Sequence, residues 1–297
     1  MKYQTKIAVL GGDLRQVIAA RELAHSGISV ELWGLERTAG EELPIAHSLE
    51  EAVRGKDAVL LPLPATTDGS TLFCPLASSE KRVRLTDVVE ILPSGALLVG
   101  GRIPESVVAF AEGAGIRVRD YFDSEEFQIQ NAYTTAEAAI SIAMNSLTRN
   151  LRGARVAVTG FGRISKHLVR LLRALDANVT VVARKREDLA WAESFGCDTL
   201  RLREGVIPRE LAQGFDVIYN TVPHWLFGRE FLEMTTKETF LIDLASVPGG
   251  VDVLAAKELG SNVLWATSLP GKYAPKSAGD LIADCVRKIL SEEVGGE

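Results

Sequence analysis

Two glycines one residue apart stand where a dinucleotide could bind. Gly160 and Gly162 follow the apolar run Val156-Ala157-Val158 and precede an amphipathic stretch. A strand, a G-x-G turn and a helix together suit a pyrophosphate. The first glycine permits the tight turn, and the second lets backbone amides approach the phosphates at the positive end of the helix. Ser165 occupies the third glycine position, and we expect this small side chain to permit close helix–sheet packing. The alternative is a glycine turn that binds nothing.

The end of the next predicted strand carries cations instead of a carboxylate. This segment reads Val182-Ala183-Arg184-Lys185-Arg186. An NAD site normally ends this strand with Asp or Glu, which accepts a hydrogen bond from the ribose 2′-hydroxyl. Arg184 could instead grip a 2′-phosphate as a charged fork, and Lys185 could meet it as a point charge. The segment therefore favours NADP over NAD. The alternative is that these are solvated charges at the start of a helix.

Three further loops, each after a predicted strand of the same half, complete the predicted cofactor site. Ligands of a doubly wound sheet bind outside the carboxyl ends of its strands, so we expect these loops to approach the nicotinamide and its ribose. Ordinary turn chemistry is the alternative for each loop. The predicted cofactor-binding residues are Gly160, Phe161, Gly162, Arg163, Ile164, Arg184, Lys185, Thr221, Val222, Pro223, Asp243, Ala245, Ser246, Leu269 and Pro270.

Arg15, Lys272 and His224 are the candidates for acting on a substrate. Arg15 opens the first predicted helix and could bind an anion, as could Lys272 or Lys276 in the second half. His224 follows a predicted strand end, and a histidine pKa of about 6.5 suits a general base. The alternatives are a surface arginine and a packed loop histidine. The four histidines and three cysteines lack the spacing of metal ligands, so we predict no metal site.

The elements that would position these residues occur as two similar series. Short apolar runs alternate with amphipathic stretches, which is typical of parallel strands joined by helical crossovers. We predict an α/β protein of two doubly wound parallel-sheet domains, the second a Rossmann dinucleotide-binding domain, joined by a connecting helix that Thr134 or Thr135 caps. Its predicted parts are an N-terminal substrate-side domain (residues 1–133), the connecting helix (134–150), the Rossmann NADP-binding domain (151–275) and a C-terminal helix that packs back toward the N-terminal domain (276–297). A cleft between such domains is the usual meeting place of cofactor and substrate.

Composition narrows the class of protein. The chain has 297 residues, of which 46% are hydrophobic and 24% charged, as in an ordinary globular protein. Its net charge of −6 gives no basic field for nucleic acid or an anionic membrane, and no apolar run is long enough to span a bilayer. The N-terminus lacks the apolar core of a signal peptide, and three scattered cysteines fit a reducing, cytoplasmic setting. A homo-oligomer is expected on general grounds.

Several motifs, in one order along the chain, resemble those of the bacterial dipicolinate synthase A subunits. The resemblance covers nearly the whole sequence, and its two C-terminal motifs are the most specific. Two positions depart from the family pattern: Ser165 replaces a usual glycine, and Thr134 stands where proline is common. The motifs are Gly11 to Gln16, Pro64-Ala65-Thr66-Thr67, Gly160 to Arg163, Asp243 to Gly250 and Leu269 to Gly279.

The resemblance implies a function. It implies an NADP-dependent oxidoreductase acting on CH–CH groups, which oxidises a dihydrodipicolinate-type dicarboxylate to dipicolinate in the mother cell of a sporulating bacterium. Two hydrogens leave the ring, one of them as a hydride to the nicotinamide. It also implies the flavoprotein-like B subunit of dipicolinate synthase as partner. Two alternatives stay open. One is another NADP-dependent oxidoreductase of 2-oxo, 2-hydroxy or amino acids, and the other is a non-catalytic nucleotide-binding subunit.

Overall fold

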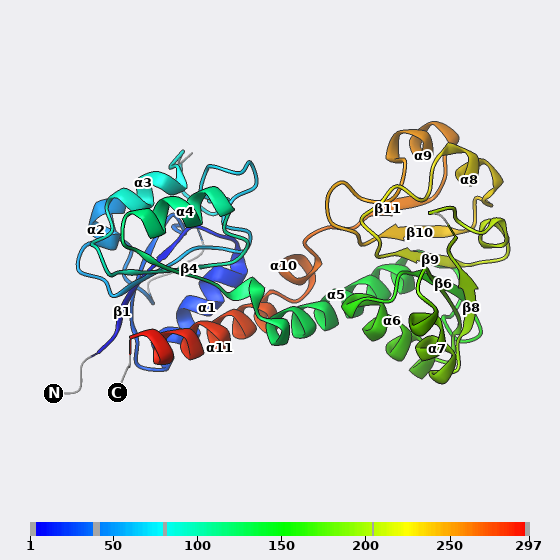
Figure 1. Cartoon of the computed structure of the whole chain (residues 1–297), viewed down its shortest axis with the longest axis horizontal. Coiled ribbons are helices and arrows are strands. Elements are labelled where there is room, and N and C mark those ends of the chain that lie inside the picture. Colours follow the sequence, from blue (N-terminus) through cyan, green and yellow to red (C-terminus); the bar gives the residue numbers. More distant parts are fainter. Residues whose placement is uncertain (1–3, 38–41, 80–81, 204, 295–297) are drawn as a thin grey trace. The chain divides into compact units, whose positions relative to one another are not determined.

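The computed structural model describes residues 4–37, 42–79, 82–203 and 205–294. The chain forms two compact units, Met1–Gln130 with Ala274–Glu297, and Asn131–Tyr273. Each unit is a parallel sheet with helices on both faces (Figure 1). This confirms the predicted fold class. None of the helices in the described parts of the chain has both the length and the apolar character that crossing a bilayer requires.

The first unit is built on a five-stranded parallel sheet. Its strand order is β2-β1-β3-β4-β5. The order reverses between β1 and β3, and in such a sheet this switch point opens a crevice at the carboxyl ends of the strands. The strands are β1 (Lys6–Leu10), β2 (Ser29–Trp33), β3 (Ala58–Leu60), β4 (Leu97–Gly100) and β5 (Arg117–Asp120).

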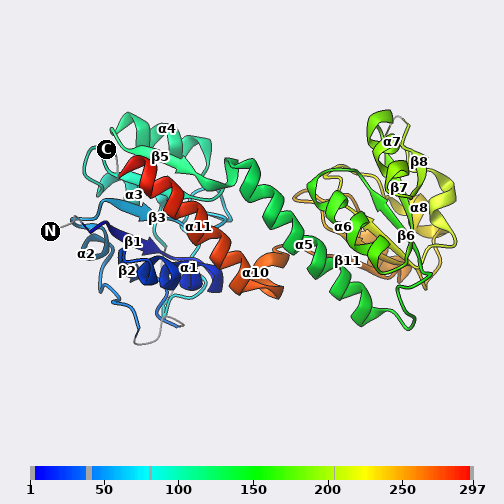
Figure 2. The same cartoon turned by 90° about the horizontal axis from the view of Figure 1, so that it is seen from below.

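Helices cover both faces of this sheet. Figure 1 shows α2, α3 and α4 over one face, and Figure 2 shows α1 and α11 side by side over the other. A Cβ atom at Gly279 of α11 would lie 2.7 Å from Cβ of Ile18 on α1, so the glycine permits this close approach. The helices are α1 (Leu14–His25), α2 (Leu49–Val53), α3 (Leu85–Glu90), α4 (Glu105–Gly113) and α11 (Pro275–Glu293), with a 3₁₀ turn at Tyr121–Asp123.

The second unit has a six-stranded parallel sheet of order β11-β10-β9-β6-β7-β8. This is the Rossmann order, with its switch point between β6 and β9. The strands are β6 (Arg155–Thr159), β7 (Asn178–Ala183), β8 (Asp198–Arg201), β9 (Val217–Asn220), β10 (Phe240–Asp243) and β11 (Val263–Trp265).

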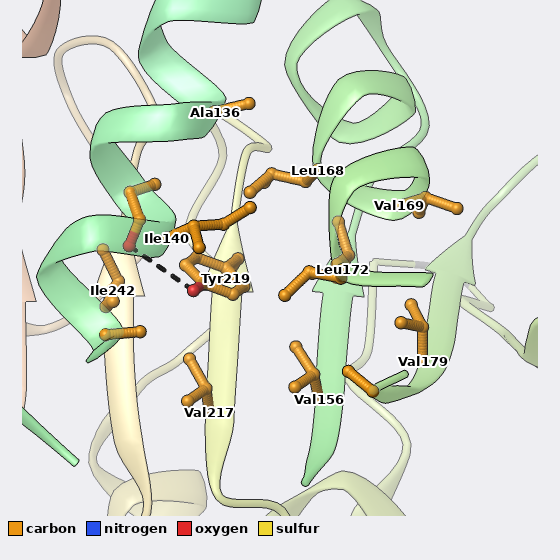
Figure 3. Packing of buried hydrophobic residues seen from close by; sticks show 14 of the residues in the cluster. Ala136, Ile140, Val156, Leu168, Val169, Leu172, Val179, Val217, Tyr219 and Ile242 are labelled. Atoms are coloured by element: carbon orange, nitrogen blue, oxygen red, sulfur yellow. Dashed lines mark hydrogen bonds between the residues drawn. The ribbon is translucent and has the colours of Figure 1, made fainter. Parts of the chain in front are cut away.

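Two layers of helices bury the faces of the second sheet. Helices α5 (Glu125–Ser146), α6 (Arg163–Ala174) and α7 (Arg186–Ser194) cover one face, while α8 (Arg229–Met234), α9 (Val253–Leu259) and a 3₁₀ turn (Arg209–Ala212) cover the other. Figure 3 shows Leu168 and Leu172 of α6 packed over β6 and β9. The Tyr219 hydroxyl in this layer donates to the Ala139 carbonyl of α5 (3.4 Å). Its burial raises the pKa of Tyr219.

The long helix α5 begins at Glu125 and ends at Ser146, so its predicted start at Thr134 or Thr135 is wrong. The Thr135 hydroxyl donates to the Asn131 carbonyl one turn earlier, and therefore binds within the helix instead of capping it. At the true start, the Ser124 hydroxyl accepts from the Phe127 amide, and Glu125 and Glu126 occupy the positive first turn.

Candidate functional site: the glycine turn of the second unit

Gly160 directly follows β6, in a conformation that favours glycine. Its φ is +85°, and a Cβ atom there would lie 2.7 Å from Oγ1 of Thr221 and 3.0 Å from Cγ2 of Val222. The left-handed backbone and the crowding both disfavour any side chain. The turn thus carries the chain directly from the sheet into α6, while holding it against the loop after β9.

Gly162 is a glycine that the fold itself does not require. Its φ of −83° is an ordinary value, and a Cβ atom at this position would meet nothing within 4 Å. It is the N-cap of α6, and within the described residues no side chain caps that end of the helix. Open space beside uncapped first-turn amides is the arrangement that a pyrophosphate needs.

Ser165, in place of the third glycine, is fully buried and satisfied. Its hydroxyl lies 2.8 Å from Oγ1 of Thr221, which itself donates to the Thr159 carbonyl of β6 (2.8 Å). The serine therefore ties the first turn of α6 to the loop after β9. Since both hydroxyls have partners, this departure from the usual motif leaves no unsatisfied polar group.

A buried polar network joins the carboxyl ends of β6, β9 and β10. The Thr159 hydroxyl donates to Oδ1 of Asn220 (2.6 Å), and Nδ2 of Asn220 donates to Oδ1 of Asp243 (2.8 Å). The Asp243 carboxylate also accepts from the backbone amides of Ala245 (3.1 Å) and Gly250 (2.8 Å). Asp243, which is 1% exposed, therefore holds its own loop in place. Nothing in the sequence predicted the part that Thr159 and Asn220 play.

We expect Asp243→Ala to lower the free energy of unfolding by about 3 kcal/mol, because it leaves one buried amide side chain and two backbone amides without their acceptor. Denaturant unfolding measures this change. Asp198→Ala, at the exposed start of β8, is the control and should change stability by less than about 0.5 kcal/mol. A similar loss in both variants would contradict the structural role of the network.

Two cations at the tip of β7 are exposed to solvent. Ala183 ends the strand and is buried, and Arg184 and Lys185 follow it in solvent. Within the described part of the chain neither side chain has a hydrogen bond or an ion pair. Both are therefore available to an anion.

The remaining predicted cofactor residues follow the ends of β6, β9 and β10 or belong to a short helix after β11. Phe161 is buried, with its ring 6.2 Å from that of Phe195, and Pro223 and Ser246 are exposed. The predicted loop after the last strand is instead a short helix, α10 (Leu269–Tyr273). Leu269 and Pro270 are buried in it. The structure thus brings Gly160, Thr221 and Val222 into direct proximity.

His224 and Lys272 are both exposed, and within the described residues neither side chain has a polar partner. A Cβ atom at Gly205 would lie 3.9 Å from Nε2 of His224, so this histidine stands beside the loop that follows β8. Among the described residues, no three His, Cys, Asp or Glu side chains gather as metal ligands would.

Arg15 belongs to the first unit, where it is 6% exposed. Its Nε and Nη2 donate to the two oxygens of Asp13 (2.9 and 2.7 Å), and Nη2 also donates to the Leu63 carbonyl. Nη1 has no hydrogen bond within the described residues. The buried hydroxyl of Tyr121 likewise has no hydrogen-bond partner among the described residues, and burial raises the pKa of Tyr121.

Lys276 is held by Glu22 and Asp280 of the same unit, and its hydrogen bond with Asp280 is the main cause of its raised pKa.

Comparisons with known proteins agree with this geometry. Residues 6–122 match the family model for the N-terminal domain of the dipicolinate synthase A subunit, and residues 124–246 match that of the D-isomer specific 2-hydroxyacid dehydrogenase, NAD binding domain. The chain is 30% identical over 296 residues to the dipicolinate synthase A subunit of Bacillus subtilis (strain 168), covering 97% of this chain and 96% of that protein.

Two crystal structures are also similar. The dipicolinate synthase A subunit from Bacillus halodurans has a TM-score of 0.85 and 27% identity, covering 97% of this chain and 98% of that one. The A chain of dipicolinate synthase from Bacillus subtilis has a TM-score of 0.85 and 29% identity, covering 100% and 99%. The dehydrogenase-like fold with an NAD-binding domain supports an oxidoreductase with a nicotinamide dinucleotide cofactor.

Proposed function

This chain belongs to the family of dipicolinate synthase A subunits, and on that premise we propose that it oxidises a dihydrodipicolinate-type dicarboxylate to dipicolinate with NADP. Its partner is the flavoprotein-like B subunit of the synthase, and its setting is the cytoplasm of the mother cell during sporulation. The observation that carries the proposal is the open, uncapped N-terminus of α6 at Gly162.

The residues present fit a dinucleotide phosphate. The space that a side chain at Gly162 would fill lies beside uncapped amides, which suits a pyrophosphate. Ala183 stands where an NAD site carries its ribose-binding carboxylate, and Arg184 and Lys185 follow it without partners among the described residues. A 2′-phosphate would be the negatively charged partner of these two side chains.

The chemistry divides between cofactor and protein. Bound NADP supplies the acceptor for the hydride that leaves the dihydropyridine ring. The remaining proton goes to water or to His224, an exposed candidate base, and the ring becomes aromatic. The protein orients the planar substrate and binds its two carboxylates. Arg15 and Lys272 are our candidates for that binding, since Nη1 of Arg15 and Nζ of Lys272 are without partners in the described residues.

We expect Arg15→Lys to raise the KM for the dicarboxylate about fivefold. A lysine keeps the charge, but its single nitrogen cannot bind Asp13 and the Leu63 carbonyl as Nε and Nη2 do and also replace Nη1 toward the substrate. The Kd for NADPH should stay within about twofold, since cofactor and carboxylate would use different groups. Steady-state kinetics and a separate NADPH titration measure the two quantities. The control is Arg21→Lys on the same helix, which should leave both the KM and the Kd unchanged. A loss confined to cofactor binding would contradict the role of Arg15.

The test of the proposed function is a reaction with purified protein. The chain is incubated with NADP and freshly made dihydrodipicolinate, alone and with the B subunit, while the absorbances of NADPH and of dipicolinate are followed. Equal formation of both products supports the proposal. Dipicolinate without NADPH would mean that a different acceptor is used. Turnover only with 2-oxo, 2-hydroxy or amino acids would identify another oxidoreductase, and cofactor binding without turnover would identify a non-catalytic, nucleotide-binding component.

A further inference from the structure

We propose that Arg201, on the strand beside β7, is a second arginine that binds the 2′-phosphate of the cofactor and helps to select NADP. This inference rests on the proposed function, because it assumes that the second unit binds NADP. The sequence alone assigns the 2′-phosphate only to residues that directly follow β7. The pairing of β7 with β8 brings a third cation to the same strand end.

The strand register places Arg201 directly beside the ribose-binding position. Ala183 and Arg201 are Cα partners in the parallel β7–β8 pair, and the Leu202 amide donates to the Ala183 carbonyl (3.0 Å). Neighbouring strands lie about 4.8 Å apart, a distance that an arginine side chain can span. Because Ala183 is small, no side chain at its own position competes for the space that a carboxylate occupies in an NAD site.

The alternation of side chains along β8 places Arg201 on the α7 face. Leu200 and Leu202 pack in the cluster on the opposite face of the sheet, with residues of α8 and α9. The Thr199 hydroxyl donates to Glu193 of α7 (2.9 Å), so position 199 faces α7. Position 201 shares that face because successive strand residues alternate. Ala183 packs in the cluster on this same face.

Among the residues that the structure describes, none neutralises the charge of Arg201. The side chain is exposed and, within the described residues, has neither an ion pair nor a hydrogen bond, as is also true of Arg184 and Lys185. Glu187 and Asp188, which follow Arg184 and Lys185 in the sequence, lie in the first turn of α7. Asp198 stands at the opposite end of β8 from Arg201, and Glu193 is bound to Thr199. Arg184, Lys185 and Arg201 thus stand at the neighbouring ends of β7 and β8 without an ion pair to any described residue, and their local positive field suits a dianionic phosphate.

The experiment is a titration of the full-length protein with NADPH, NADH and adenosine 2′,5′-bisphosphate. We expect Arg201→Ala to weaken NADPH and the bisphosphate about tenfold, the value of one charge-assisted contact, and NADH by less than about twofold. The control is Arg152→Ala, an exposed arginine (82% for its side chain) that precedes β6, and it should leave all three affinities unchanged.

The outcomes separate this inference from the proposed function. If Arg201→Ala binds NADPH like the unmodified protein while Arg184→Ala loses it, Arg201 is an ordinary solvated edge-strand residue and the inference is wrong, but the NADP site stands. If the unmodified protein shows no preference for NADPH over NADH, the NADP part of the proposed function fails, and the inference fails with it. An equal loss of NADH and NADPH in Arg201→Ala would also overturn the assignment to the 2′-phosphate.

Discussion

Replacing Gly162 with valine is expected to weaken NADPH binding at least about a hundredfold, because the side chain would fill the space beside the first-turn amides of α6 and block two or more charge-assisted hydrogen bonds. The fold should tolerate the change. The φ of −83° suits any residue, and a Cβ atom meets nothing within 4 Å. The loss of stability should stay below about 1 kcal/mol, the cost of valine at an N-cap. Calorimetric titration and denaturant unfolding of one preparation measure both quantities.

Two other glycines provide controls for this experiment. Gly113→Val in α4 makes the same chemical change where a Cβ atom also meets nothing, and should leave NADPH binding intact. Gly160→Ala should instead destabilise the protein, because its φ is +85° and Oγ1 of Thr221 is 2.7 Å from the added Cβ atom. A Gly162→Val protein that binds NADPH normally would show that no pyrophosphate lies at the start of α6.

Arg184→Ala is expected to weaken NADPH about thirtyfold and NADH by no more than about twofold, because the side chain would contact only the phosphate by which the two cofactors differ. The difference should shrink as salt is raised, since exposed charges are screened. Titrations with both cofactors at low and high ionic strength measure this effect.

The matched control is Arg209→Ala. That side chain is 79% exposed in a surface ion pair with Glu230, on a 3₁₀ turn remote in sequence from β7. It should change neither affinity. An equal loss of NADH and NADPH in Arg184→Ala would remove the argument for the 2′-phosphate.

Strong local signals made much of this fold predictable. The buried strands, the glycine turn and the helix after it could be identified because apolar periodicity and turn glycines lie close together in the sequence. Strand β8 could not be identified, because Asp198, Thr199 and Arg201 leave one apolar residue in its four. Pairing with β7, and not the composition of β8, makes this segment a strand. The proposed role of Arg201 depends on this pairing, so the sequence alone could not suggest it.

Other features depend on contacts distant in sequence. The fork of Arg15 is bound to Asp13 and to Leu63, forty-eight positions away. The sequence alone therefore predicts a cation at Arg15 but not which groups its guanidinium binds. Asn220 and Asp243 are separate strand-end residues there, although a single hydrogen bond joins them in the fold. Thr134 and Thr135 are residue types that often cap helices, so the sequence predicts the start of α5 too late. In the fold the Ser124 hydroxyl binds a first-turn amide, and the Thr135 hydroxyl binds within the helix.

The most direct test of the cofactor site is a comparison of NADPH and NADH binding to the unmodified protein. Tryptophan fluorescence, or calorimetry where the quenching is small, gives both dissociation constants at low ionic strength. The start of α6 has no side-chain cap, and the cations after β7 have no partner, among the residues that the structure describes. We therefore expect that both cofactors bind and that NADPH binds at least about tenfold more tightly. Binding of neither cofactor would contradict the dinucleotide site itself, and a tighter complex with NADH would contradict its selectivity.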